Sequence, residues 1–234
     1  MQRTSLHIAI VLLIGALPTL AQDNLYDLTL LGSFTTSSKL FHHPDDADEI
    51  IRSQFVSLDN IFGVGFDLRR AIEPFSVQLG LSVEYLSKTE SFDFPTSGSR
   101  TIPVKDGYTT IPIELSGYFF IPIGDEHIRF YMGGGGGTYI GRRHYEYAGT
   151  RAATVEQHVG FGIHILSGLL YRLAPRLSLR SELKFRDVQF ETVNKFTQQS
   201  IFFRGTPLYL DQEPFASRVN IDGMALTLGL AVHF

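Results

Sequence analysis

The sequence predicts an all-β protein, an eight-stranded antiparallel up-and-down β-barrel that crosses a membrane. Its last segment, Met224–Phe234, alternates strictly between apolar residues and small or polar ones. Such alternation is typical of a strand with one apolar and one polar face. No segment of the mature chain offers the ~20 unbroken apolar residues of a membrane-spanning helix, and the other structure that can span lipid is a closed barrel. The connections between the expected strands also alternate between short and long.

Residues 1–21 are expected to form a cleaved signal peptide, which leaves residues 22–234 as one barrel domain. A weakly basic start precedes the apolar run Ile8–Leu17, and Thr19 and Ala21 supply the small side chains of a cleavage site. An uncleaved N-terminal anchor is the alternative, but this apolar run is too short to span a bilayer.

The mature chain is mildly acidic and lacks cysteine. Removing Arg3 with the signal peptide leaves 19 basic against 24 acidic residues, which argues against nucleic acid as a partner. Without cysteine, neither a disulfide nor a lipid attached to an N-terminal cysteine is expected.

The first two strands are expected at about Leu25–Thr35 and Val56–Leu68. Apolar residues alternate along one face of the first, at Tyr26, Leu28, Leu30 and Phe34. The second has an apolar outward face of Phe62, Val64, Phe66 and Leu68 and an inward face of Asp59, Gly63, Gly65 and Asp67.

The third and fourth strands are expected at Phe75–Tyr85 and about Tyr108–Phe120. The third shows the cleanest alternation in the chain. The fourth directs Ile111, Ile113, Leu115 and Phe119 outward and Glu114 and Ser116 inward. It also contains Pro112, which cannot donate to a ladder, so a local irregularity is expected there.

The last four strands complete the ring. The fifth, Ile128–Ile140, includes the run Gly133–Gly137, and the sixth covers about Val155–Tyr171. The seventh begins at Leu177 and alternates apolar residues with Ser178, Arg180, Glu182, Lys184 and Arg186. Met224–Phe234 is the eighth.

Connection lengths predict the orientation of the barrel. The short connections are Arg69–Pro74, Ile121–His127 and Arg172–Arg176. The long connections are about Thr36–Phe55, Thr89–Gly107, Arg142–Thr154 and Glu191–Asn220. Short periplasmic turns and long extracellular loops are typical of membrane barrels, whereas a soluble exported β-sandwich, the alternative, has no reason to sort its loops. Aromatic girdles are expected at Phe130, Tyr171 and Phe234 below and at Tyr85 and Tyr108 above.

These patterns resemble the small OmpA/OmpX-like and opacity-protein-like outer-membrane barrels of Gram-negative bacteria. The resemblance covers the mature chain and includes the hairpin from Ile111-Pro-Ile113 to Phe130-Tyr-Met-Gly-Gly-Gly135. It implies an outer-membrane location. It also implies that a terminal strand closing on Phe234 is the signal read by the barrel-insertion machinery.

Charged side chains gather on the inward faces of the strands. The predicted structural network of the lumen consists of Glu84, Glu114, Arg180, Glu182, Lys184 and Arg186, and Arg129, His164 and Arg172 also point inward. An eight-stranded barrel is just wide enough to be filled by its own side chains, so these charges should pair. Glu84 is expected level with Lys184 and Arg186, and Glu114 nearer Arg180. An ion pathway is the alternative.

No motif predicts a cofactor, a metal or catalysis. Gly133–Gly137 lacks the Lys-Ser/Thr of a phosphate-binding loop, so a bent strand with aromatic side chains over its bare backbone is the better interpretation. His164 and Ser167 point to opposite faces of a strand and form no dyad. His42-His43 beside Asp45-Asp46 lacks defined metal-ligand spacing.

The sequence therefore predicts a non-enzymatic outer-membrane barrel with a structural or surface-interaction role carried by its extracellular loops. A narrow porin and a lipid-modifying outer-membrane enzyme are the alternatives. The expected partners are outer-membrane lipids, the insertion machinery and an extracellular molecule bound by the loops, and the barrel is expected to be a monomer.

Overall fold

The computed structural model describes residues 25–73, 75–96 and 100–234. The predicted signal peptide, residues 1–21, lies outside the described residues, and its cleavage stays a prediction. No helix in the described part of the chain is long and apolar enough to cross a membrane.

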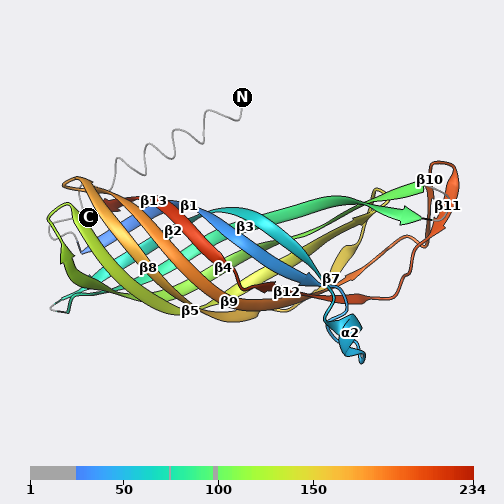
Figure 1. The fold of residues 1–234 in the computed structure, drawn as a ribbon, viewed down its shortest axis with the longest axis horizontal. Coiled ribbons are helices and arrows are strands. Elements are labelled where there is room, and N and C mark those ends of the chain that lie inside the picture. The colour runs from blue at the N-terminus through green and yellow to red at the C-terminus, as the bar shows by residue number, and fades with distance from the viewer. Residues whose placement is uncertain (1–24, 74, 97–99) are drawn as a thin grey trace.

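Long antiparallel strands wind around a common axis (Figure 1). The elements are β1 (Tyr26–Phe41), α2 (Glu49–Arg52), β2 (Phe55–Ile72), β3 (Val77–Thr96), β4 (Arg100–Gly124), β5 (Ile128–Tyr147), β6 (Thr150–Arg151), β7 (Ala153–Gln157), β8 (Gly160–Ala174), β9 (Leu177–Lys195), β10 (Ser200–Phe203), β11 (Thr206–Tyr209), β12 (Phe215–Ile221) and β13 (Met224–His233).

Eight antiparallel strands close the ring, which confirms the predicted up-and-down β-barrel. Their order is β1, β13, β9, β8, β5, β4, β3 and β2, and β2 pairs with β1 again. The strand β12 continues β13 upward, because it lies between the same two neighbours, β1 and β9. Paired backbone bonds of 2.8 Å join Tyr26 and Phe234 where the first and last strands meet.

The strands extend much farther than the sequence predicts. β3 and β4 pair as far as Thr96 and Arg100, and β4 and β5 as far as Val104 and Tyr147. Many residues expected in long extracellular loops therefore belong to strands that project beyond the apolar exterior. The prediction followed outward apolar residues, which stop at the edge of that exterior, whereas backbone pairing continues above it. Helix α2 and the hairpin β10–β11 lie at this projecting end, opposite the C terminus (Figure 1).

Two strands change the facing of their side chains where they leave the membrane-facing zone. In β2, Asn60 has a φ of 56°, a left-handed conformation that Asn tolerates better than most residues. Below it Ile61 is buried and above it Leu58 is buried, so Asp59, predicted to point inward, is exposed. The facing in β1 shifts at the same level, between Thr35 and Ser38.

The irregularity expected at Pro112 is present and small. The β3–β4 ladder pairs Val83 with Ile113 and then Leu86 with Thr110, omitting the two intervening pairs while keeping the same register. Pro112 still lies opposite Tyr139 on the other side of its strand.

Apolar side chains cover the outside of the middle of the barrel. Leu30, Phe66, Leu115 and Ile165 are each between 59% and 67% exposed. This band continues around the ring and is the surface expected of a barrel in lipid. Tyr85 lies on the exterior as predicted, but Tyr108 does not: it is fully buried inside the barrel.

Candidate functional site

The lumen holds two layers of buried charges. In the lower layer Arg69 of β2 binds Asp67 at 2.5 Å and also contacts Glu182 of β9. Arg180 of β9 binds Asp27 of β1 at 2.6 Å. The Arg69 guanidinium also lies 3.5 Å from the centre of the Tyr118 ring, a favourable cation–π distance.

The upper layer joins β3, β4 and β9. Lys184 Nζ lies 2.7 Å from Glu114 and 3.3 Å from Glu84. Arg186 contacts Glu84 through Nη2, and its Nε lies 3.1 Å from Glu114. The Tyr139 hydroxyl donates to Glu114 from β5. Two carboxylates thus face two cations, which offsets the large cost of removing each charge from water.

All six residues of the predicted network lie in these two layers, but one expected neighbour is wrong. Glu84 does contact Lys184 and Arg186. Glu114, expected nearer Arg180, contacts Lys184 and Arg186 instead. The reason is the stagger of the strands, which shifts the inward residues of β4 relative to those of β9 and cannot be obtained from counting residues along each strand.

Sequence reasoning missed three further groups of the lower layer. These are Arg69, which the sequence predicts in a short turn, and Asp27 and Tyr131, which no predicted network includes; all three are buried. The Tyr131 hydroxyl donates to Glu182 at 2.6 Å. The alternation of facing along each strand could have located two of them. Asp27 lies two residues from the inward Thr29, and Arg69 lies two residues from the inward Asp67, so both are expected to point inward.

The glycine run makes room for this network. A Cβ built on Gly133 would lie 2.8 Å from Cδ1 of Tyr118, and one on Gly137 would lie 2.9 Å from Cγ of Glu114. Both distances are shorter than real Cβ contacts allow. The bare backbone of β5 therefore accommodates an aromatic ring and a carboxylate from β4, in agreement with the aromatic side chains predicted to lie over it.

A buried serine and histidine face each other in the upper layer. Ser116 Oγ lies 2.8 Å from His164 Nε2, and His164 Nδ1 lies 3.9 Å from Glu114 Oε1. This geometry resembles part of a nucleophile–base–acid arrangement. However, the 3.9 Å separation is too long for a hydrogen bond, and Ser116 and His164 are each only 2% exposed.

An apolar plug fills the lumen above the charges. It consists of Leu40, Leu58, Ile61, Leu86, Tyr108, Phe190, Val219 and Ile221. The Tyr108 and Phe190 rings meet edge to face, with centroids 5.8 Å apart. Among the described residues, the lumen is therefore blocked twice, once by ion pairs and once by apolar side chains.

A third polar group lies above the plug. Arg143 binds Asp106 at 2.5 and 2.8 Å, and His42 Nε2 lies 3.0 Å from Asp106. Burial alone would raise the pKa of Asp106, but the hydrogen bonds from His42 and Arg143 hold that pKa below its ordinary value. Among the described residues, no group of His, Asp and Glu side chains has an arrangement that could hold a metal ion.

The periplasmic mouth holds the remaining two predicted inward residues. Arg129 and Arg172 line a cavity of about 400 Å³ together with Asp27 and His233. Both arginines are exposed, so they stand at the entrance rather than in the buried layers. Arg129 stacks on the Phe120 ring at 3.8 Å.

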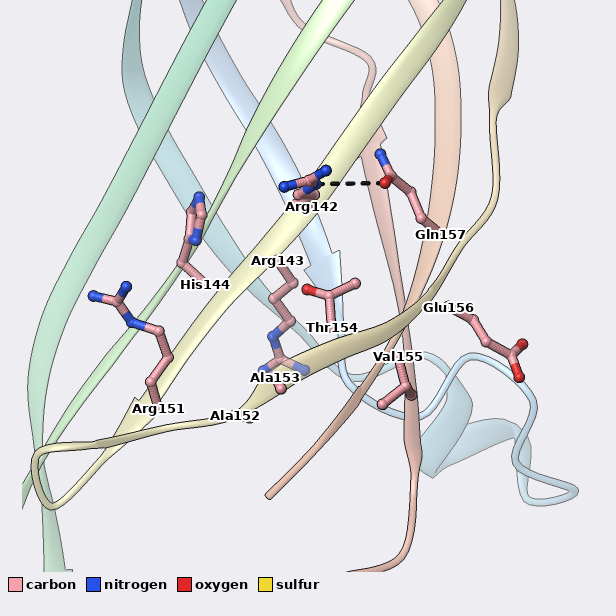
Figure 2. Close-up of a pocket in the computed structure, with 10 residues that line it drawn as sticks. All are labelled: Arg142, Arg143, His144, Arg151, Ala152, Ala153, Thr154, Val155, Glu156 and Gln157. Carbon is pink, nitrogen blue, oxygen red and sulfur yellow. Dashed lines mark hydrogen bonds between the residues drawn. The ribbon is translucent and has the colours of Figure 1, made fainter. Parts of the chain in front are cut away.

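A cavity of about 470 Å³ opens in the wall near the extracellular end. Strand β5 pairs with β8 only as far as Tyr139 and Gly160, because β7 turns away to pair with β9. Figure 2 shows Arg142 and Gln157 pointing toward each other across this opening, joined by a 3.4 Å hydrogen bond. His144 lies farther along β5 than Arg142, Arg151 lies beyond His144, and Glu156 points away (Figure 2).

The terminal residue is placed at the closing seam. The Phe234 ring stacks on Tyr26 of β1, with centroids 6.0 Å apart and an interplanar angle of 16°. Its role as an insertion signal stays a prediction.

The fold is similar to that of solved outer-membrane proteins. The outer membrane protein OprG from Pseudomonas aeruginosa matches with a TM-score of 0.58 and 13% identity, over 89% of this chain and 95% of that one. Neisserial surface protein A matches with a TM-score of 0.45 and 10% identity over 89% and 97%. Ail of Yersinia pestis matches with a TM-score of 0.44 and 12% identity over 89% and 98%.

No protein-family model matches the chain. No curated protein matches it in sequence. The closed ring, its apolar exterior and the likeness to OprG together show that the chain has the fold of the small outer-membrane β-barrels.

Proposed function

We propose that the protein resides in the bacterial outer membrane as a non-enzymatic monomeric barrel, and that its projecting extracellular end carries a structural or surface-interaction role. The observation that carries this proposal is the doubly blocked lumen. A solute crossing the barrel would have to separate the Lys184 and Arg186 ion pairs and then displace the Tyr108–Phe190 plug. Both are costly, because broken buried pairs leave charges uncompensated.

The projecting end offers side chains suited to contact. Phe202 and Tyr209 of the hairpin β10–β11 are 83% and 82% exposed. Exposed aromatic residues at the tip of a rigid scaffold are typical of binding surfaces. A partner outside the cell would meet this hairpin before it met the lumen.

An enzyme is the first rival. Ser116 and His164 are its best candidates within the described residues, but their burial denies a substrate access, and Glu114 lies 3.9 Å from the histidine, too far for a hydrogen bond. Mass spectrometry of the lipid A of cells with and without the protein tests the lipid-modifying form of this rival.

The insertion machinery and membrane lipids are the proposed partners in assembly. The alternating strand β13 ends one residue before Phe234, with Leu226, Leu228 and Leu230 facing outward. This is the form of terminal strand that the resemblance associates with insertion.

The test of the proposed role replaces Ser200–Tyr209 with a short Gly-Ser linker and measures binding of cells to host-cell and abiotic surfaces. We expect binding to fall while the barrel keeps its heat-dependent gel shift, since β10 and β11 pair only with each other. A second variant keeps the hairpin and replaces only Phe202 and Tyr209 with Ser. It should show the same loss of binding if these two aromatic side chains make the contact. Unchanged binding by both variants would contradict the proposed role of this end.

A further inference from the structure

The opening between β5 and β7 lies at the edge of the lipid-facing surface. On β5 the outward side chains Phe130, Met132 and Ile140 are between 39% and 46% exposed, and Arg142 is the next outward residue above Ile140. On the neighbouring strand β4, Ile111 pairs with Ile140 and Thr109 pairs with Arg142. Apolar side chains therefore give way to polar ones between these two rows. Lipid headgroups lie at this level of a membrane barrel.

The opening carries more positive than negative charge, because its lining includes Arg142, Arg143 and Arg151 but only one carboxylate, Glu156. Arg142 makes no ion pair with any described carboxylate, and its Nε donates to the amide oxygen of Gln157. Arg151 is 73% exposed and lies 3.9 Å from Glu146, which Lys105 binds more closely at 3.0 Å. Burial and the charges of Arg151 and Arg142 hold the pKa of His144 below its ordinary value. The site thus disfavours a further cation and favours an anion.

The neutral groups around the opening are also hydrogen-bond donors. Gln157 Nε2 is buried and has no partner within the described residues. The Thr154 hydroxyl lines the same cavity. Guanidinium groups bind phosphate oxygens in pairs of parallel hydrogen bonds, and amide and hydroxyl donors can complete the shell.

We propose that this opening binds the phosphate of an outer-leaflet lipid headgroup, with Arg142 and Arg151 as its cationic ligands and Gln157 as a neutral donor. The cavity of about 470 Å³ can hold a phosphate together with part of the sugar or glycerol that carries it. The acyl chains of the lipid would then lie over the exposed apolar row that begins at Ile140 and continues across β8 at Phe161 and Ile163. The inference rests on the proposed function only for the orientation of the barrel.

Native mass spectrometry of the detergent-refolded barrel tests the proposal, with lipid A and enzymatically dephosphorylated lipid A as probes. We expect the intact lipid to bind at least about tenfold more tightly than the dephosphorylated one. The double variant Arg142→Gln/Arg151→Gln should lose about tenfold in affinity for intact lipid A, since each basic residue near a charged membrane surface contributes measurably.

The matched control is Arg52→Gln/Arg204→Gln, which removes the same charge from two extracellular arginines, in α2 and in the β10–β11 turn. It should bind lipid A like the unchanged protein. Equal binding by the Arg142/Arg151 variant and the control would overturn the proposal. So would binding of inorganic phosphate alone as tight as that of lipid A, which would mark a site for free anions.

A heat-dependent gel shift of every variant shows that the barrel has folded. A folded, non-conducting barrel that binds both lipids equally contradicts this inference and leaves the proposed function standing. A barrel that conducts but still binds the phosphorylated lipid more tightly contradicts the proposed function and leaves this inference standing.

Discussion

Glu114 is buried completely and contacts Lys184, Arg186 and Tyr139. Its removal would leave two cations facing a single remaining carboxylate, Glu84. We therefore expect Glu114→Ala to lower the free energy of unfolding by ~3–5 kcal/mol, whereas Glu213→Ala, at an exposed site, should cost ~0–1 kcal/mol. Urea titration of both variants in detergent is the measurement. Coinciding midpoints would show that the upper charge layer does not stabilise the barrel.

Asp106 gives the extracellular end a dependence on pH. Because its pKa is lower in the folded protein than its ordinary value of 3.8, folding is favoured above that value and the benefit is lost as the pH falls. We expect the stability difference between the unchanged protein and Asp106→Asn to shrink below about pH 4. Thermal unfolding of both from neutral to acid pH measures it. A difference that stays constant across this range would refute the role assigned to Asp106.

Strand number and facing could be predicted, because lipid imposes outward apolar side chains at every second position in the membrane zone. Phe66, Leu115 and Ile165 follow that rule. Above the zone the rule ends: Leu58 and Leu86 turn inward and Asp59 outward, so the sequence does not reveal where each strand ends. The ion-pair partners across the lumen were harder to predict from the sequence than the ends of the strands. Glu114 meets Lys184 rather than Arg180 because strand stagger, not position in the strand, sets the level of each residue.

The strand β13 carries the closure of the ring. Its residues pair on one side with β1, as Leu230 does with Leu30, and on the other with β9, as Leu230 does with Leu179. We expect deletion of Leu230–Phe234 to prevent membrane assembly, because both neighbours would be left with open edges. The matched control deletes Ser200–Tyr209, which pairs only within its own hairpin. Membrane fractionation and the gel shift of unboiled protein report the outcome; normal insertion of the C-terminal deletion would speak against β13 as the closing strand.

At the scale of the whole molecule, the distribution of apolar and charged side chains within the membrane zone is the opposite of that in a soluble protein. Apolar side chains face outward where lipid surrounds the barrel, and charges fill the interior at the same level, in the layers of Arg69 and Arg186. Above the membrane zone the Tyr108–Phe190 plug fills the interior below the buried Arg143–Asp106 pair, and ion pairs such as Lys39–Asp222 lie outside. A barrel of eight strands is so narrow that its own side chains fill the interior.

The most direct test of a closed barrel is the conductance of the refolded protein in a planar lipid bilayer. We expect no stable, porin-sized current steps, because water-filled porins need about 16 strands while eight enclose a space that side chains fill. Steady large steps from protein whose gel shift shows it to be folded would contradict the account and establish a channel.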